Sequence, residues 1–189
     1  ELIVKILMVF AEFERTSIIN RITQAYAHRS EMGFYMGGRQ PYGFELIPAI
    51  INNIKTKKLS PIHSEVEQLR YIFEVYAQEN VSLRRLLDIL IAENKKPLNG
   101  SDWTTAKLST LLKNPIYVKA DFEVYEYYER LGVQMITDVS MFTGEYGAQL
   151  YGHTKHDPQS DDWSDTKLVL LTHNGIIDSD IWLKCQRKL

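Results

Sequence analysis

The sequence ILMVFAEFERTSIINRITQAYAHRSEMGFYMGGRQPYGF, residues 6–44, sets the architecture of this 189-residue chain. No proline or glycine interrupts the first 32 residues, and Gly33 is the first position suited to a left-handed helix cap. Apolar side chains recur close to helical spacing, at Leu7, Phe10, Ala11, Phe13, Ile18, Ile19, Ile22 and Ala25. The pattern predicts one helix of about 30 residues, roughly 45–50 Å long. A helix longer than a small domain requires usually connects two bodies or lies along a partner.

A glycine-rich segment, residues 37–43 with the sequence GGRQPYG, follows this helix and is called the strap below. Its three glycines let the backbone lie close to another surface, while Pro41 stiffens the path. The preceding helix carries His28 and three arginines on one broad face: Arg15, Arg21 and Arg29. An arginine-bearing strap after a basic helix is typical of an insert into the minor groove of DNA. An ordinary interdomain linker with solvated charges explains the same residues equally well.

The composition is that of a globular protein, with 44% hydrophobic and 24% charged residues. No apolar run reaches the roughly 18 residues that indicate a membrane span, and no signal peptide is visible. Cys185 is the single cysteine, which argues against an internal disulfide and a cysteine-based zinc site and fits a cytoplasmic protein. The chain does not begin with methionine, so we expect it to be a fragment of a longer protein.

Charge is unevenly distributed, although the net charge is only −2. Residues 1–60 hold 8 Lys or Arg and 5 Asp or Glu, whereas residues 119–189 hold 7 and 12. The middle segment, residues 61–118, is balanced. DNA affinity depends on a local basic face rather than on total charge. We therefore expect the helix and strap to face DNA and the acidic third to face away.

Two further helices are predicted from residue 60 onward. Ser60 and Pro61 fit the N-cap and first turn of the first helix. Its buried stripe is expected to be Val66, Leu69, Ile72, Phe73 and Tyr76. Ser82 is expected to cap the next helix. The core face of that helix would be Leu83, Leu86, Leu87 and Leu90.

A third helix is predicted to start around Trp103, capped by Asp102 or Thr104, and to stop at Asn114-Pro115. Its outward side chains are Thr104, Thr105, Lys107, Ser109, Thr110 and Lys113. With the preceding helix it would form a helix-turn-helix variant, in which hydroxyl and lysine side chains contact base edges while helix amides meet phosphates. The connecting loop is longer than the usual three or four residues, so an ordinary helical hairpin is the alternative.

The remaining segments mix strands with helices. Residues 44–54 are expected to be extended and to lead into a short basic loop at Lys55, Lys57 and Lys58. Residues 121–131 suit a helix or a strand. Asp178 is expected to cap a final helix, residues 179–189. Further strands are predicted at residues 133–137, 148–151 and 167–172.

Several of these motifs occur together in one known family. They are FAEFER at residues 10–15, Arg21, Gly33, Gly37-Gly38 and Pro41-Tyr42-Gly43. In this combination they resemble the large serine recombinases, which include phage serine integrases and the recombinases of conjugative transposons. The segments 82–117, with Trp103 and Asn114-Pro115-Ile116-Tyr117, and 173–189 are similar to the recombinase domain of that family. The resemblance covers most of the chain and is weakest over residues 133–166.

The resemblance implies an α+β fold in three parts. Residues 1–36 would be a connecting and oligomerisation helix, residues 37–44 the strap, and residues 45–189 a mainly helical recombinase domain with a helix-turn-helix-like pair and a small β-sheet. The fragment would bind double-stranded attachment-site DNA for integration or excision of a mobile element. The full-length protein would be a cytoplasmic, bacterial or phage-encoded serine recombinase that acts as a homo-oligomer without a membrane partner.

The expected DNA contacts combine the residue reasoning with this resemblance. They are Arg15, Arg21, Arg29, Gly37, Gly38, Arg39, Gln40, Tyr42, Thr104, Thr105, Lys107 and Lys113. No catalytic residue is expected, because the family's nucleophilic serine lies in an N-terminal domain that we do not find in this sequence. Ser17 and Ser30 lie on the long helix, without an arginine pocket that would activate them.

No cofactor or metal is expected. A polar loop has metal-ligand chemistry without ligand spacing, at His153, His156, Asp157, Asp161, Asp162 and Asp165. Two other functions are alternatives to DNA binding. One is a helical oligomerisation and protein-interaction module, favoured by the apolar start at Leu2, Ile3, Ile6, Leu7 and Phe10. The other, an autonomous transcription regulator, is disfavoured by the bare N-terminal helix.

Overall fold

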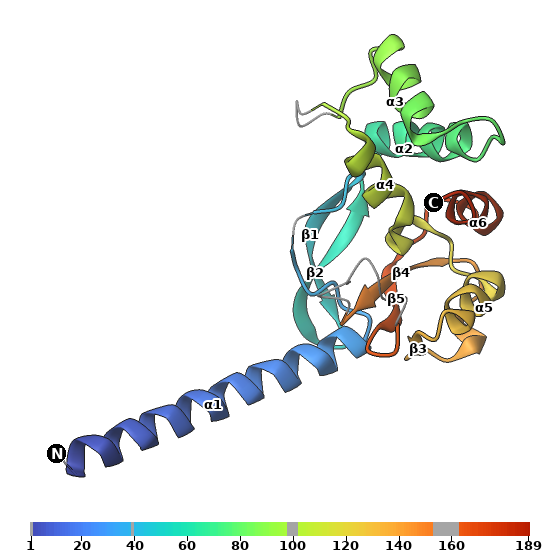
Figure 1. The fold of residues 1–189 in the computed structure, drawn as a ribbon. Coiled ribbons are helices and arrows are strands. Elements are labelled where there is room, and N and C mark those ends of the chain that lie inside the picture. The colour runs from blue at the N-terminus through green and yellow to red at the C-terminus, as the bar shows by residue number, and fades with distance from the viewer. Residues whose placement is uncertain (1, 39, 98–101, 153–162) are drawn as a thin grey trace.

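The computed structural model describes residues 2–38, 40–97, 102–152 and 163–189. Within these residues the chain folds into six α-helices, five β-strands and two short 3₁₀-helices (Figure 1). The elements are α1 (Leu2–Glu31), β1 (Phe44–Ile51), β2 (Ile54–Pro61), α2 (His63–Tyr76), α3 (Leu83–Ala92), α4 (Thr105–Lys113), η1 (Pro115–Tyr117), α5 (Phe122–Arg130), β3 (Gln134–Met135), η2 (Val139–Met141), β4 (Tyr146–Tyr151), β5 (Lys167–Asn174) and α6 (Ser179–Gln186). The predicted α+β class is confirmed.

Helix α1 extends away from the rest of the molecule, which we call the body (Figure 1). It ends at Glu31, and Gly33, where the sequence predicts the cap, follows with a φ of 78°. The Phe34 N–H donates to the Arg29 carbonyl at 3.3 Å and the Gly33 N–H donates to the Ser30 carbonyl at 3.0 Å. This is the Schellman pattern of helix termination. A Cβ on Gly33 would also lie 2.6 Å from the Leu170 carbonyl oxygen, so both conformation and packing require glycine.

The last two turns of α1 attach it to the body. Glu31 pairs with Lys167 at 2.9 Å, and the hydrogen bond from Lys167, together with its charge, lowers the pKa of Glu31. The ring of Tyr26 meets the ring of Tyr151 edge-on at 6.5 Å, and the Tyr151 hydroxyl donates to the Phe34 carbonyl at 2.9 Å. Residues 2–26 of the helix are exposed, so its long apolar surface lies outside the body.

Strands β1 and β2 form a two-stranded antiparallel ribbon, residues 44–61 (Figure 1). The turn at Asn52 and Asn53 has φ values of 49° and 60°. Two left-handed residues in a two-residue loop match the primed turns that suit the twist of a hairpin. At the base of the ribbon Phe44 and Leu59 are buried in the core. The base therefore holds the ribbon in place while its turn end projects.

Two sequence predictions fail at this ribbon. Lys55, Lys57 and Lys58 lie in β2 and not in a loop. Ser60 and Pro61 also belong to β2 and do not start a helix. The partner strand explains this result, because Ser60 pairs with Glu45 and Pro61 with Phe44 in the ladder. Helix α2 starts only at His63, after Ile62, which provides no side-chain cap.

Side-chain caps begin three of the later helices. The Ser82 hydroxyl accepts a hydrogen bond from the Arg85 N–H at 3.2 Å at the start of α3. Thr104 does the same for the Lys107 N–H at 3.2 Å at the start of α4. Asp121 accepts from two N–H groups of the first turn of α5, and this segment is therefore helical and not a strand. Such caps satisfy backbone donors that the helix itself leaves free.

Helix α6 differs from the prediction at both ends. Asp178 precedes it but makes no side-chain cap. Instead, the Asp178 carboxylate binds the Lys119 ammonium at 2.6 Å. The helix ends at Gln186 rather than at Leu189. One buried face of α6 presents Trp182, Leu183 and Cys185 to the core.

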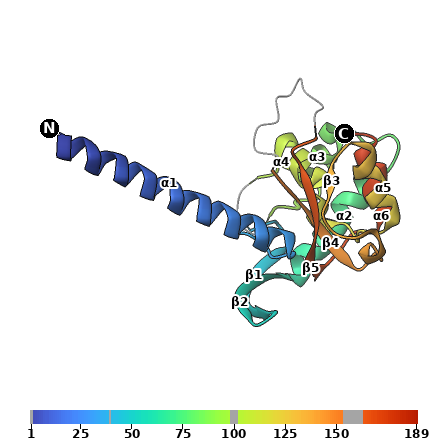
Figure 2. The ribbon, with the colours of Figure 1, turned by 90° about the horizontal axis from the view of Figure 1, so that it is seen from below.

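A second sheet, of three strands, lies in the order β3-β5-β4. Strand β3 is parallel to β5, and β4 is antiparallel to it. The β component is thus divided into the ribbon and this sheet. The core continues from the helices onto β5, whose Leu168 and Val169 are at most 1% exposed. Helices α5 and α6 lie on the side of the body opposite the ribbon (Figures 1 and 2).

Among the described residues, no helix has both the length and the hydropathy to cross a membrane.

Candidate nucleic-acid interface

Helix α4 buries one face and presents polar side chains on the other. Its inner face contains Leu108, Leu111 and Leu112. Of the predicted contacts, Thr104, Lys107 and Lys113 are exposed and Thr105 is half-buried. The Lys107 ammonium donates to the Asp102 carbonyl at 2.8 Å, which places a positive charge at the start of the helix. The outer face of α4 therefore carries hydroxyl and ammonium groups together, as the sequence predicts.

The strap leads from the end of α1 to the base of the ribbon. Gly37 and Gly38 are exposed and have φ values of 93° and 100°. These left-handed conformations favour glycine. Gln40 is exposed, whereas Arg39 lies outside the described residues. Residues with a side chain would adopt the backbone angles of Gly37 and Gly38 only with strain.

The strap packs against the N-terminal end of α4 through Tyr42. Its ring meets the Trp103 ring edge-on, with centroids 5.2 Å apart and planes at 81°. Within the described part of the chain, neither the Tyr42 hydroxyl nor the Trp103 ring N–H has a hydrogen-bond partner. Burial, and secondarily the Glu65 carboxylate, raise the pKa of Tyr42 well above its ordinary value. Tyr42 is therefore neutral and acts here as an aromatic packing group.

Glu65, on the first turn of α2, holds the next residue of the strap. Its carboxylate accepts a hydrogen bond from the Gly43 N–H at 2.7 Å. Phe44 then stacks on Tyr117, with ring centroids 5.9 Å apart. The end of the strap is consequently fixed from two sides, by a charge-assisted hydrogen bond and by ring packing.

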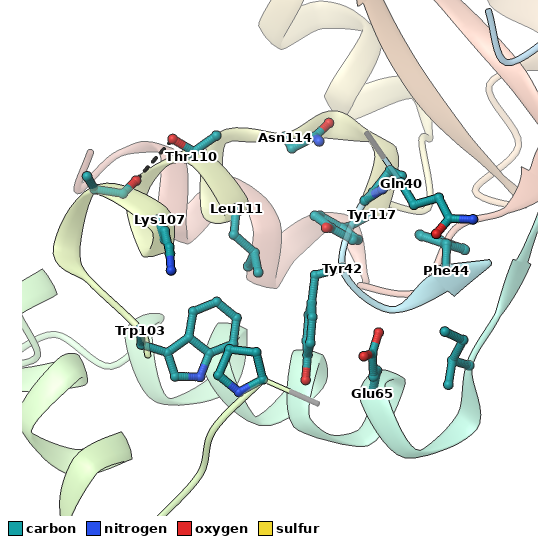
Figure 3. Close-up of a pocket in the computed structure, with 14 residues that line it drawn as sticks. Gln40, Tyr42, Phe44, Glu65, Trp103, Lys107, Thr110, Leu111, Asn114 and Tyr117 are labelled. Carbon is teal, nitrogen blue, oxygen red and sulfur yellow. Dashed lines mark hydrogen bonds between the residues drawn. The ribbon is translucent and has the colours of Figure 1, made fainter. Parts of the chain in front are cut away.

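A cleft of about 660 Å³ lies where the strap meets α4 (Figure 3). Its lining brings three predicted contacts together: Gln40 and Tyr42 from the strap and Lys107 from α4. Glu65, Trp103 and Asn114 also line it. None of these three is among the DNA contacts expected from the sequence. The position of Trp103 directly before α4 could have marked it as a candidate. Its contact with Tyr42 could not be predicted, because the two residues are 61 positions apart and no local pattern connects them.

The arginines of α1 are not brought to this cleft. Arg15 and Arg21 are exposed along the helix. At about 1.5 Å per residue, they lie roughly 24 and 15 Å along the axis from the end of α1. Arg29 is half-buried, and its guanidinium lies 5.8 Å from the centre of the Phe34 ring. Arg29 therefore has an intramolecular partner, whereas the other two are presented outward.

No metal centre emerges from the described residues, in which no three His, Cys, Asp or Glu side chains form a group suited to a metal ion. The polar loop considered in the sequence falls almost entirely within residues 153–162, outside the described ranges. Cys185 is buried, and burial raises its pKa to about 12. This thiol is consequently a core group and not a metal ligand or nucleophile.

The fold and the cleft define a class of protein in which a long helix and a strap lead into a compact α+β domain that presents a polar helix. The sequence profile of the Recombinase family matches residues 63–189. The chain belongs to this family, and its resemblance to the recombinase domain of large serine recombinases is confirmed.

Comparisons with other proteins add two findings. No curated protein matches the chain. Among solved structures, the chain is similar to the crystal structure of an LSR–DNA complex, with 15% sequence identity and a TM-score of 0.48 over 89% of this chain. The chain spans 38% of the length of that protein.

Proposed function

We propose that this chain is the DNA-binding part of a site-specific serine recombinase and that it binds duplex attachment-site DNA for integration or excision of a mobile element. One observation carries the proposal: the strap and the polar helix α4 meet at one cleft, through the contact between Tyr42 and Trp103. Two elements of different shape are thereby held in a fixed relation. That arrangement suits a duplex, whose two grooves require two different readers.

Each element has a role in this proposal. Helix α4 faces the major groove, where Thr104, Thr105, Lys107 and Lys113 contact base edges or phosphates. The strap follows the minor groove, where Gly37 and Gly38 allow a close backbone approach and Gln40 and Tyr42 flank the path. Arg39, which the structure does not describe, is the proposed insert. The arginines of α1, Arg15, Arg21 and Arg29, extend the contact to the sugar-phosphate backbone.

The distribution of charge supports this orientation. Helix α5 carries Glu123, Glu126 and Glu129 and lies on the side of the body away from the ribbon (Figure 2). Repulsion between these carboxylates and phosphates disfavours binding through that side. The strap side carries the basic groups named above, so the molecule has one face suited to DNA and one that opposes it.

The exposed surface of α1 favours a second function that is compatible with the first. Leu7 is 62% exposed and Phe10 is 67% exposed, and the pattern continues to Ile22 at 64%. An apolar surface of this length indicates an interaction site. We propose that α1 joins copies of the full-length protein into a homo-oligomer. A purely helical interaction module without DNA contacts is the alternative.

The enzymatic activity of the whole protein is also part of the proposal. The parent protein would exchange DNA strands with a nucleophilic serine carried outside the residues described here. Ser30 is unsuited to that role, because it is 5% exposed and its hydroxyl donates to the Ala27 carbonyl at 2.7 Å. A nucleophilic hydroxyl requires access to the substrate and a group that activates it.

Fluorescence anisotropy with the full chain and a labelled random duplex of about 30 base pairs, across a salt series, tests the proposal. We expect affinity that falls steeply with salt. Arg39→Ala should lower the affinity and reduce the slope of log K against log salt by up to about 0.9, because an arginine in the minor groove neutralises about one phosphate charge. Arg130→Ala is the matched control, because Arg130 pairs with Glu126 at 3.1 Å on α5. An unchanged slope in Arg39→Ala refutes the strap assignment, and no binding at low salt refutes DNA binding itself.

A further inference from the structure

The ribbon carries a concentration of positive charge that the proposed site does not use. Residues 44–61 contain three lysines, Lys55, Lys57 and Lys58, and one acidic residue, Glu45. Residues 1–43 contain five Lys or Arg but four Asp or Glu. Most of the positive excess of the first 60 residues therefore belongs to the ribbon and not to the helix and strap.

The three lysines are exposed and have no ionic partner in the described parts of the chain. Several other cations of the body are paired, Lys95 with Glu93, Lys119 with Asp178 and Lys184 with Asp180. The exposed Arg70, Arg85 and Lys113 also have no ion pair among the described residues, but they lie on three different helices. An unpaired ammonium is free to exchange its hydration and counterions for a phosphate. The ribbon thus presents three available positive charges on one short element.

The geometry of the ribbon distributes these charges over both of its faces. Side chains alternate along a strand, so Lys55 and Lys57 share one face and Lys58 lies on the other. Lys55 is opposite Ile50 and Lys57 is opposite Pro48 in the ladder. The major groove admits a two-stranded ribbon. A ribbon that enters or borders a groove in this orientation can present cations to the phosphates on both sides.

The ribbon is also close enough to the strap to share its ligand. Phe44 begins β1 two residues after Tyr42, and Lys58 and Lys55 are opposite Ile47 and Ile50. At about 3.4 Å per residue, the three lysines lie roughly 10–20 Å along the ribbon from its base. A duplex rises about 3.4 Å per base pair, so this distance corresponds to about three to six base pairs. The ribbon stands out from the body on the side where α1 joins it (Figures 1 and 2).

We propose that the β1–β2 ribbon is a third DNA-contacting element, in which Lys55, Lys57 and Lys58 bind phosphates that flank the segment held by the strap and α4. This inference rests on the proposed DNA binding. The exposed side chain of Ile50 at the turn end would equally suit a protein, but three unpaired cations favour a polyanion. The ribbon increases affinity and the length of the site without adding sequence specificity, because phosphates are the same at every base pair.

The test replaces all three lysines with glutamine in the full chain and measures affinity for the labelled random duplex of about 30 base pairs across the same salt series. The slope of log K against log salt should fall by up to about 2.7, or about 0.9 per lost contact, which is roughly eightfold in affinity per contact near 0.1 M salt. A companion variant with arginine at the three positions should retain the wild-type slope. Both variants should melt at the wild-type temperature, since all three positions are exposed.

A matched control removes the same charge elsewhere, through Lys95→Gln, Arg130→Gln and Lys184→Gln, each of which breaks a surface ion pair. This control should keep the wild-type slope. If the control and the ribbon variant weaken binding equally, the effect is one of net charge and the ribbon inference is wrong. A wild-type slope in the ribbon variant also overturns it, while binding by the wild-type chain shows that the proposed function stands. If the wild-type chain itself does not bind the duplex, both proposals fail.

Discussion

At the scale of single residues, His173 shows how a polar group can serve the core. It is 5% exposed, its Nε2 lies 2.8 Å from the Ile116 carbonyl, and its ring meets Phe44 edge-on at 4.9 Å. Gly147 allows this contact, since a Cβ there would lie 2.4 Å from the His173 Nε2. Burial lowers the pKa of His173 to about 4, against an ordinary value of 6.5. The imidazole is therefore neutral in the folded protein at neutral pH.

His173 should make the stability of the protein depend on pH. The unfolded chain binds a proton near pH 6.5 and the folded chain only near pH 4, so stability is complete above pH 6.5 and falls as pH decreases to 4. The full loss is about 3 kcal/mol. Urea unfolding at a series of pH values measures it.

Two variants separate this effect from other titrations. His173→Gln should flatten the profile between pH 6.5 and 4.5, and His63→Gln, at an exposed position, should leave it unchanged. The acidic groups whose pKa is lowered, Glu31 and Asp138, have ordinary values of 4.5 and 3.8. These two carboxylates therefore change the free energy of unfolding mainly below the window of pH 6.5 to 4.5. An undiminished slope in His173→Gln would contradict the assignment.

At the scale of elements, the joint between the strap and α4 has a measurable consequence. Trp103→Ala removes the ring against which Tyr42 packs, so the strap and α4 lose their fixed relation. We expect roughly a tenfold loss of duplex affinity, about 1.4 kcal/mol, measured by anisotropy well below the melting temperature. Trp103→Phe keeps an aromatic surface and should retain most of the affinity. Equal losses in the two variants would show that the indole itself, and not the packing, is required.

Elements with local signals could be predicted from the sequence, and elements that depend on distant partners could not. The apolar periodicity and the caps at Ser82 and Thr104 located α3 and α4, because those interactions lie within a few residues. Ser60 and Pro61 carry helix-start signals as well, but pairing with β1 overrides them. Pro48 lies within strand β1. The ribbon tolerates it because each strand of a two-stranded sheet is an edge strand, where a missing N–H is harmless.

The same distinction applies to the candidate site. The polar face of α4 follows from its helical period, and the path of the strap follows from its glycines. The cleft does not, since Tyr42 and Trp103 meet across 61 positions and Glu65 reaches Gly43 from α2. The sequence shows the lysines of the ribbon only as a basic segment, because their strand partner and their lack of an ion pair depend on residues distant in the chain.

At the scale of the whole molecule, the apolar surface of α1 should drive self-association. Leu2, Leu7 and Phe10 are each more than 60% exposed, and water disfavours such a surface by about 25 cal/mol per Å². We expect the chain to form oligomers in sedimentation velocity experiments at micromolar concentration. Leu7→Gln with Phe10→Gln should shift it toward the monomer.

The control for this experiment changes apolar residues that are exposed outside α1. Ile50 is 70% exposed and Phe122 is 55% exposed, and Ile50→Gln with Phe122→Gln should leave the oligomer intact. A chain that remains monomeric at all concentrations would remove the support for an oligomerisation helix. The affinity for DNA of the monomeric variant then shows whether the two functions are separable.

The attachment of α1 gives the molecule the properties of a lever. Among the described residues, the contacts that fix the helix to the body lie within its last two turns and the cap at Gly33, while the free arm is about 40 Å long. A rotation of only 10° at this pivot would move the far end by about 7 Å, roughly two base-pair steps. Small rearrangements where the strap leaves the helix therefore produce large displacements at the distant N-terminus. The ion pair between Glu31 and Lys167 lies at the point about which the helix would rotate.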